Sequence, residues 1–203
     1  MIDEQTVRCY DERASELAGR YESVVAGTPG LRWLWWGGPA RVLDVGCGSG
    51  RDLAMLADLG CAVVGVEPSA AMRAEAERLH PSLRGRILVG HVGSLGDVGG
   101  PVDAVICAAV LMHLPAGHVE PALRSLRGVM VAGGRLLVSI STARADLDPD
   151  RRDYAGRLFA PVSVAECVRA ADAVGLRLVA ARFVGDSLGR ASVRWATLLF
   201  LAS

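Results

Sequence analysis

The sequence contains no lysine: its 22 basic residues are all arginines, and they balance 22 acidic residues to a formal net charge of zero. A chain without lysine has no Walker A lysine, no Schiff base and no lysine general base. The neutral balance also argues against a nucleic-acid partner, because phosphate binding draws on a clustered positive field. The composition therefore excludes several enzyme classes, and positive charge can gather only in a local arginine patch.

Paired cysteines and long apolar runs are missing as well. The five cysteines are widely spaced, form no C-x-x-C pair and have no histidine at zinc-ligand spacing, so we expect reduced, mostly buried thiols and no metal site. No apolar stretch reaches the ~18 residues that a membrane helix needs. The N-terminal residues MIDE are acidic and polar where a signal peptide is basic and then apolar. These absences predict a cytoplasmic protein without a membrane partner.

The chain is 203 residues long, with 51% hydrophobic and 5% aromatic residues, which suits one domain over residues 1–203. After residue 39, short apolar runs alternate with amphipathic segments, a pattern typical of successive βαβ units and a parallel sheet. The predicted strands cover residues 41–45, 62–66, 86–89, 103–107, 134–140, 176–183 and 193–201. The predicted helices cover residues 51–59, 70–79, 119–129 and 164–174.

Two segments lie outside this alternation. Residues 1–38 are predicted to form an N-terminal helical cap, because apolar positions recur at helical spacing over residues 3–26. A short piece with Trp33, Trp35 and Trp36 comes next, interpreted as packing against the sheet edge or as a membrane or partner patch. Residues 39–203 are the core, in which the polar segment 143–161 is interpreted as a lid or crossing loop.

The strongest local motif is VLDVGCGSG at residues 42–50, a buried strand that runs into alternating glycines and then a helix. Glycines at such a turn let the backbone approach a ligand and aim helix N–H groups at its negative end. Alone, the motif is also compatible with an ordinary strand-to-helix turn or a dinucleotide site. The dinucleotide fingerprint requires a sixth-place glycine, and Arg51 occupies that place.

A single acid lies at a diagnostic distance from this turn. Glu67 ends the predicted strand 62–66 and lies 21 positions after Gly46. A carboxylate at this place can accept both ribose hydroxyls of an adenosine, although a lone strand-end acid is often only solvated. The combination with the glycine turn favours the ribose interpretation.

Together these motifs resemble those of class I S-adenosylmethionine-dependent methyltransferases, and more closely those of short bacterial members of mostly unassigned substrate. Residues 44–50 match the first motif of the family, and Glu67 its ribose-binding acid. Residues 103–114 resemble the fourth strand and the segment after it, and residues 131–138 the turn before the fifth strand. The resemblance implies a Rossmann-like α/β fold: a seven-stranded, mostly parallel sheet with helices on both faces and an antiparallel last strand.

The resemblance also implies a cofactor, S-adenosylmethionine, and residues that would hold it. Asp44, Gly46, Gly48 and Gly50 would shape the methionine end, Met72 would pack near the adenine, and backbone carbonyls around Cys107 and Ala108 would meet the methionine amine. Cys47 and Pro68 lie within the two motifs and are included in the predicted site. The chain departs from many relatives at His91, where an adenine-binding aspartate is common. His91 is interpreted either as a cofactor contact or as a loop histidine.

A methyl sulfonium is already activated, so transfer requires positioning and, for some acceptors, removal of a proton. His113 comes after the predicted strand 103–107 on the side of the ligand crevice, and it is a candidate general base or else an orienting residue. Tyr10 and Tyr21 share a helical face that would close over the cofactor or pack in the core. A last group is interpreted either as recognising a carboxylate or phosphate of the acceptor or as solvated: Arg157, Arg190 and Arg194.

The predicted function is therefore methyl transfer to a small-molecule acceptor, by a monomer or a homodimer. A base methyltransferase of DNA or RNA is disfavoured, because residues 107–110 (CAAV) lack the Asn/Asp-Pro-Pro-aromatic motif. Two alternatives stay open: a module that binds the cofactor without turnover, and an NAD-dependent oxidoreductase. The absence of a Tyr-x-x-x-Lys motif counts against the latter.

Overall fold

The computed structural model describes residues 2–24, 28–34 and 40–203. Its centre is a seven-stranded sheet with the order β3-β2-β1-β4-β5-β7-β6. The strands are β1 (Arg41–Val45), β2 (Ala62–Glu67), β3 (Ile87–Val89), β4 (Val102–Ala108), β5 (Met130–Ala143), β6 (Leu176–Gly185) and β7 (Arg194–Ala202). The pairs from β3 to β5 are parallel, and β7 is antiparallel to both of its neighbours. The predicted Rossmann-like sheet with an antiparallel last strand is confirmed.

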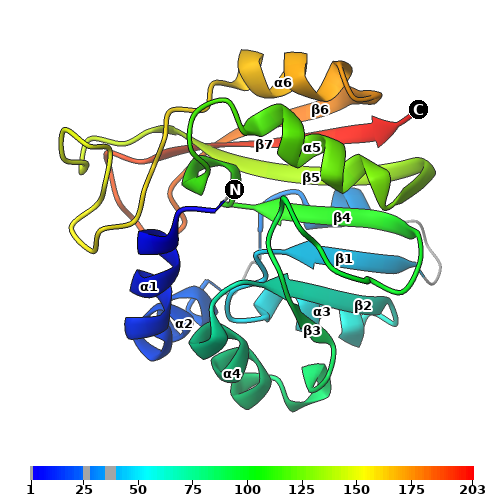
Figure 1. Cartoon of the computed structure of the whole chain (residues 1–203), viewed down its shortest axis with the longest axis horizontal. Helices are drawn as coiled ribbons and strands as arrows, with labels where there is room; N and C mark the ends of the chain where they lie inside the picture. Colours follow the sequence, from blue (N-terminus) through cyan, green and yellow to red (C-terminus); the bar gives the residue numbers. More distant parts are fainter. Residues whose placement is uncertain (1, 25–27, 35–39) are drawn as a thin grey trace.

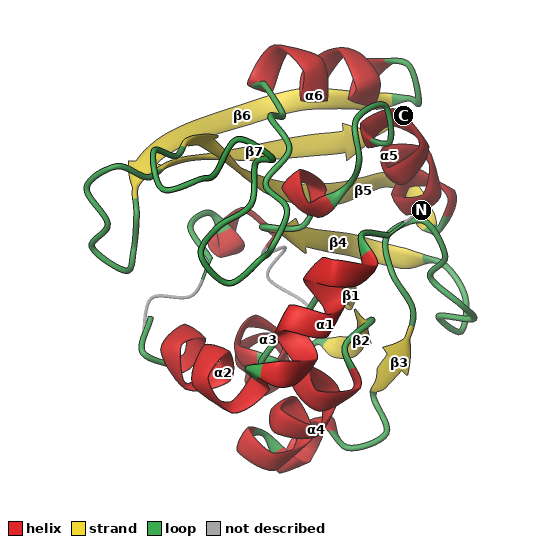
Figure 2. Ribbon diagram, turned by 60° about the vertical axis from the view of Figure 1, so that its left-hand side comes forward, coloured by secondary structure: helices red, strands yellow, loops and turns green. Residues whose placement is uncertain are grey.

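In the described part of the chain six α-helices surround this sheet, and local sequence chemistry such as the serine N-caps Ser69 and Ser163 sets where they begin. They are α1 (Glu4–Glu12), α2 (Ala14–Glu22), α3 (Arg51–Asp58), α4 (Ala70–Leu79), α5 (Val119–Gly128) and α6 (Val164–Asp172). Three short 3₁₀ turns complete the described elements: η1 (Leu31–Leu34), η2 (Pro81–Leu83) and η3 (Leu111–His113). Figure 2 shows α5 and α6 beside the β5–β7–β6 end of the sheet, and α3 and α4 beside β1 and β2.

Alternation along the strands divides the core between the two faces. On β5, Val138 and Ile140 belong to the cluster under α5 and α6, whereas Leu137 belongs to the cluster under α3 and η1. Ser139 shares the face of Leu137, since side chains of a strand alternate with period two. This register decides which β5 and β7 side chains can reach a ligand at the end of the sheet.

The structure adds detail to two elements that the sequence predicts. In the described part of the predicted N-terminal helical cap there are two helices, α1 and α2, because Arg13 between them has a φ of −121° and a ψ of 21°, which are not helical. The strand predicted at 134–140 is longer, because β5 continues to Ala143 and pairs there with Arg194 of β7. Periodicity finds an element more reliably than its ends, since tertiary pairing extends or cuts it.

The segment between β5 and α6 crosses toward the N-terminus. Figure 1 shows this loop (yellow) and α1 (blue) on the same side of the sheet, and both views place α1 next to α4. Within the loop, an isolated bridge pairs Arg152 with Leu158. Trp35 and Trp36 lie outside the described residues, and the side chain of Trp33 does as well, so the interpretation of the tryptophan patch stays a prediction. Among the helices that the structure describes, none combines the length and the apolar character of a transmembrane span.

Candidate functional site

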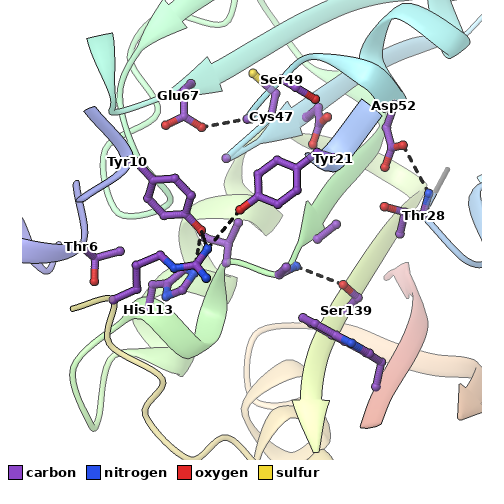
Figure 3. A pocket seen from close by; sticks show the side chains of 18 of the residues that line it. Thr6, Tyr10, Tyr21, Thr28, Cys47, Ser49, Asp52, Glu67, His113 and Ser139 are labelled. Carbon is purple, nitrogen blue, oxygen red and sulfur yellow. Dashed lines mark hydrogen bonds between the residues drawn. The ribbon is translucent and has the colours of Figure 1, made fainter. Parts of the chain in front are cut away.

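A cavity of about 280 Å³ opens at the carboxyl ends of the parallel strands, where α/β sheets bind their ligands. Besides the strand ends, it is lined by α1, α2, the loop after β5 and the loop between β6 and β7. The predicted site residues that line it are Tyr10, Tyr21, Asp44, Gly46, Cys47, Gly48, Glu67, Pro68, His91, Ala108, His113, Arg157 and Arg190. Chain segments far apart in sequence thus converge on one hollow (Figure 3).

The turn after β1 has a backbone that only glycine adopts readily. Gly46 and Gly50 have φ values of 71° and 79°, in the left-handed region. A Cβ at Gly46 would lie 2.5 Å from Val110 Cγ2, and one at Gly50 would lie 2.7 Å from Leu83 Cδ1. The turn is therefore closely packed on its inner side, which fixes the N-terminus of α3 beside the cavity.

Glu67 is tied to this turn. Its Oε2 accepts the N–H of Gly48 at 3.0 Å and its Oε1 accepts the N–H of Ser69 at 3.0 Å. The residue is 5% exposed, and burial raises its pKa to about 7, although the two backbone hydrogen bonds favour the charged form. Each carboxylate oxygen keeps a lone pair that is able to accept a hydroxyl from a ligand.

Asp44 is a buried acid that accepts no hydrogen bond from the described part of the chain, although the Arg51 charge acts to lower its pKa. It is 4% exposed, lines the cavity, and within the described residues its carboxyl accepts no hydrogen bond. Burial raises the pKa of Asp44 well above its ordinary value, and the negative charge of Asp52 raises it further. An isolated buried carboxylate is costly, so this position favours a ligand that carries a positive charge.

His113 is held by both of its ring nitrogens. Its Nδ1 faces the carbonyl oxygen of Leu158, which can only accept, so Nδ1 carries the proton and Nε2 accepts the Tyr10 hydroxyl at 3.1 Å. Burial lowers the pKa of His113 to about 4, so the ring is neutral near pH 7. A proton from an acceptor would therefore reach Nε2 through the Tyr10 hydroxyl rather than directly.

Tyr10 and Tyr21 lie on different helices, α1 and α2, yet they meet at one guanidinium. Figure 3 shows their hydroxyls pointing to the same place beside His113. Arg157 Nη1 donates to the Tyr21 hydroxyl at 3.1 Å and lies 3.4 Å from that of Tyr10. The same guanidinium donates to Asp153, whose side chain is fully buried. Arg157 is thus fully engaged inside the protein.

The other two predicted acceptor-binding arginines behave differently. Arg190 lines the cavity but donates two N–H groups to Asp186. Arg194 is exposed, does not line the cavity, and donates to the carbonyls of Ala191 and Val193. Neither geometry favours the predicted recognition of a carboxylate or phosphate, because neighbouring acceptors already hold the guanidinium groups.

Three further predicted cofactor residues do not line the cavity. Met72 is fully buried below the glycine turn, with its Cε 3.7 Å from the position of a Cβ on Gly48. Cys107 belongs to the core under α5, and Gly50 faces Leu83 of η2. These three residues pack against the residues that line the cavity and do not face the cavity themselves. His91 does line it, and its Nδ1 accepts the N–H of Gly93 at 3.1 Å.

Sequence reasoning missed several residues that line the cavity: Arg20, Thr28, Asp52, Ser139, Phe159, Asp186, Trp195 and Thr197. Residues 156–159, 194–195 and 197–199 also resemble stretches of the short bacterial methyltransferases, and this likeness was the available signal for Phe159, Trp195 and Thr197. All five cysteines are buried and unpaired, as expected. Among the described residues, no group of three histidine, cysteine or acidic side chains is placed to hold a metal ion.

Comparisons with known proteins agree with this geometry. Residues 42–134 match the family model described as a methyltransferase domain. The chain is 30% identical over 146 residues to a protein-L-isoaspartate O-methyltransferase of Methylorubrum populi, covering 66% of this chain and 63% of that protein. It is 35% identical to a ubiquinone biosynthesis O-methyltransferase of Xanthomonas axonopodis pv. citri, covering 49% of this chain and 42% of that protein. The chain thus spans less than two thirds of the length of these curated relatives.

Solved structures show the same fold. A TehB-like methyltransferase from Corynebacterium glutamicum superposes with a TM-score of 0.69 at 21% identity, covering 95% of this chain and 99% of that one. A 1,6-didemethyltoxoflavin N1-methyltransferase from Burkholderia thailandensis, solved with S-adenosylhomocysteine, gives a TM-score of 0.68 at 21% identity, covering 94% and 87%. Together with the match of residues 42–134 to a methyltransferase domain, these findings agree with the resemblance in the sequence motifs: the chain has the fold of the class I S-adenosylmethionine-dependent methyltransferases.

Proposed function

We propose that this protein transfers a methyl group from S-adenosylmethionine to a small-molecule acceptor by in-line displacement. The observation that carries the proposal is Asp44: a buried carboxyl without a hydrogen bond from the described residues, which lines the cavity together with the glycine turn and Glu67. Such an acid is stabilised by a cationic ligand. When bound, S-adenosylmethionine would supply a positively charged methyl sulfonium and an ammonium group.

The described residues offer a partner for each part of this ligand. Glu67 would accept the ribose hydroxyls through its remaining lone pairs, and Asp44 would balance the ammonium group. Arg20 of α2 lines the cavity next to Tyr21, and within the described residues its guanidinium makes no hydrogen bond. Arg20 would therefore take the carboxylate of the methionine end.

The chain contributes mainly orientation to the reaction. At the cavity wall Tyr10 is hydrogen-bonded to His113, and the Arg157 guanidinium joins this pair to the Tyr21 hydroxyl; the two phenols and the neutral imidazole would hold the acceptor in line with the methyl group. A small acceptor fits the proposal, because the whole cavity is near the lower end of the ~300–1,000 Å³ usual for small-molecule sites. We further propose that residues 1–203 act as one domain in the bacterial cytoplasm, without a nucleic-acid partner.

Calorimetric titration with S-adenosylmethionine and with S-adenosylhomocysteine tests the cofactor assignment. We expect saturable binding of both, with a thermal shift of the folded protein. If folded protein binds neither, the proposal is wrong. The runner-up, a module that binds cofactor without turnover, is separated by incubation with methyl-labelled S-adenosylmethionine and a metabolite extract, in which only an enzyme transfers label.

A further inference from the structure

One part of the cavity lies on the far side of β4 from the glycine turn and from Glu67. We call it the acceptor chamber: Ser139, Trp195 and Thr197 lie there on β5 and β7, and Tyr10, His113 and Phe159 line the same cavity. We propose that the acceptor chamber binds a small, uncharged, aromatic molecule that accepts a hydrogen bond from the Thr197 hydroxyl. This inference rests on the proposed function and names the class of its acceptor.

The first argument is charge. Three arginines line the cavity near the chamber, and each donates two N–H groups to its own acid: Arg144 to Asp146, Arg157 to Asp153 and Arg190 to Asp186. Among the described residues, the chamber therefore offers no uncompensated cation to an anionic acceptor. An acceptor that carries a carboxylate would have to displace a paired acid or enter without a partner, and both are costly.

The carboxylates and arginines of the cavity that form no salt bridge with described residues lie outside the acceptor chamber. Asp44 and Glu67 are at the end of β1 and β2, and Arg20 is next to Tyr21, whose ring lies 3.8 Å from the position of a Cβ on Gly48 of the glycine turn. These groups serve the proposed cofactor. The division of charge between the two parts of the cavity thus matches a charged cofactor and a neutral acceptor.

The second argument is an unsatisfied hydroxyl. Thr197 is 1% exposed, and within the described residues its Oγ1 has no hydrogen-bond partner. Burying such a group costs about 1–3 kcal/mol, so an unpartnered one in a native cavity indicates a ligand. Ser139 lies opposite on β5, where its Oγ accepts the N–H of Ala109 at 3.0 Å and keeps its own proton to donate.

The third argument is the shape of the wall. Trp195 lies two residues before Thr197 on the same face of β7, and its Nε1 donates to Asp186 at 2.9 Å, which fixes the indole. Phe159 packs against His113 with ring centroids 4.8 Å apart. The Arg144 guanidinium covers the Phe159 ring, with its carbon 3.8 Å from the ring centroid, so the fixed indole of Trp195 and the phenol of Tyr10 are the aromatic walls of the cavity, and they favour a planar aromatic ligand over a flexible aliphatic one.

Matched probes test this class without knowledge of the natural acceptor. Protein saturated with S-adenosylhomocysteine is titrated with para-hydroxybenzamide, with its anionic analogue para-hydroxybenzoate, and with the aliphatic cyclohexanecarboxamide. We expect the uncharged aromatic amide to bind about tenfold or more tightly than either analogue, a difference that calorimetry and saturation-transfer NMR resolve. Equal or tighter binding of the carboxylate would overturn the inference.

The variant Thr197→Val is the second test of the inference, because valine keeps the shape of threonine and removes the hydroxyl. We expect about five- to tenfold weaker binding of para-hydroxybenzamide, together with a higher melting temperature of the free protein, since the unsatisfied buried hydroxyl is gone. The matched control Thr142→Val, at an exposed position of β5 outside the cavity, should change neither. Unchanged probe affinity in Thr197→Val would contradict the assigned hydrogen bond.

The two proposals fail in different ways. If S-adenosylhomocysteine does not bind, the proposed function falls and the acceptor class falls with it. If S-adenosylhomocysteine binds with normal affinity while para-hydroxybenzamide shows no preference, only the acceptor class is wrong.

Discussion

At the scale of single residues, the site contains buried polar groups whose burial destabilises the free protein, and a bound ligand would relieve that destabilisation. Asp44 is buried without a hydrogen bond, Glu67 is buried with a pKa near 7, and the hydroxyl of Thr197 has no partner, as far as the described residues go. Each of these groups is unfavourable in the free protein. We therefore expect substitutions of these residues to affect ligand affinity and the stability of the free protein differently.

Glu67→Ala is expected to weaken binding of S-adenosylmethionine by about 1–3 kcal/mol, the cost of a lost charge-assisted hydrogen bond. Calorimetry on the folded variant measures this. Glu120→Ala, which removes an exposed acid paired with Arg124 on α5, is the matched control and should bind as the unmodified protein does. Equal affinities of the two variants would remove Glu67 from the site.

Asp44→Asn should act in opposite directions on stability and affinity. Replacing a buried carboxyl that accepts no hydrogen bond from the described residues raises the melting temperature of the free protein, and it weakens binding of the cationic cofactor by about tenfold or more. Asp58→Asn at the exposed end of α3 controls for a general effect of charge removal. A less stable Asp44→Asn variant with full affinity would show that Asp44 already has a partner in the folded protein.

At the scale of elements, the N-terminal helix α1 is fastened to the loop after β5. The Asp3 carboxylate caps α1 at the N–H of Thr6 and also pairs with Arg152, at 2.9 Å. The Thr6 hydroxyl in turn accepts the N–H of Leu158, at 2.9 Å. The carbonyl oxygen of Leu158 also accepts the Nδ1–H of His113. The contact between Asp3, Thr6 and the loop after β5 therefore positions both α1 and His113 at the cavity.

Asp3→Ala is therefore expected to lower the free energy of unfolding by about 1–2 kcal/mol, because it removes a helix cap and an ion pair together. Chemical denaturation measures the change. The control Glu16→Ala removes an exposed ion pair with Arg13 and should change the free energy of unfolding much less than Asp3→Ala does, because solvent screens an exposed pair. If the two variants lose the same stability, α1 is not fastened through Asp3.

The stability that the Asp3–Arg152 ion pair contributes depends on pH in a direction that the pKa shift of Asp3 fixes. The Arg152 guanidinium holds the pKa of Asp3 well below its usual range. A carboxyl whose folded pKa is depressed contributes stability above its unfolded pKa and loses it as the pH falls, so this fastening weakens only in acid, below about pH 4.

At the scale of the whole molecule, a chain of zero net charge buries two acids, Asp44 and Glu67, at the carboxyl ends of its parallel strands. Glu67 binds its proton more tightly in the folded state than in the unfolded state, because burial raises its pKa from 4.5 to about 7. The unfolded state then ionises first as the pH rises, so the folded state loses stability between about pH 4.5 and 7, by up to about 3 kcal/mol from this group.

We accordingly expect the free protein to melt at a lower temperature at pH 7.5 than at pH 5.5, with a smaller difference when S-adenosylmethionine is saturating. Binding should also release protons near pH 7, because ribose hydroxyls favour the charged form of Glu67. Calorimetry in buffers of different ionisation enthalpy counts these protons. No proton release would mean that Glu67 is already ionised in the free protein.

The sequence by itself determined the sheet, the turn and the acid at the end of β2. These depend on local patterns: apolar runs of strand length, glycines where φ is positive, and a carboxylate at a fixed distance along the chain. Only the tertiary structure decided which partner each predicted residue binds and which proton it carries. Arg157 is a plausible anion site until Asp153 is seen to hold it, and His113 is a plausible base until Tyr10 is seen on Nε2.

The physical reason is the range of the interactions. Backbone conformation and strand burial are fixed by neighbours within a few positions, so the sequence displays them. Charge, protonation and tautomer depend on partners brought together across the fold, as when Tyr10 meets His113 at a separation of 103 residues, or Ser139 of β5 lies opposite Thr197 of the neighbouring strand β7. Folding alone creates those pairings, and with them the division of one cavity into a charged part and a neutral part.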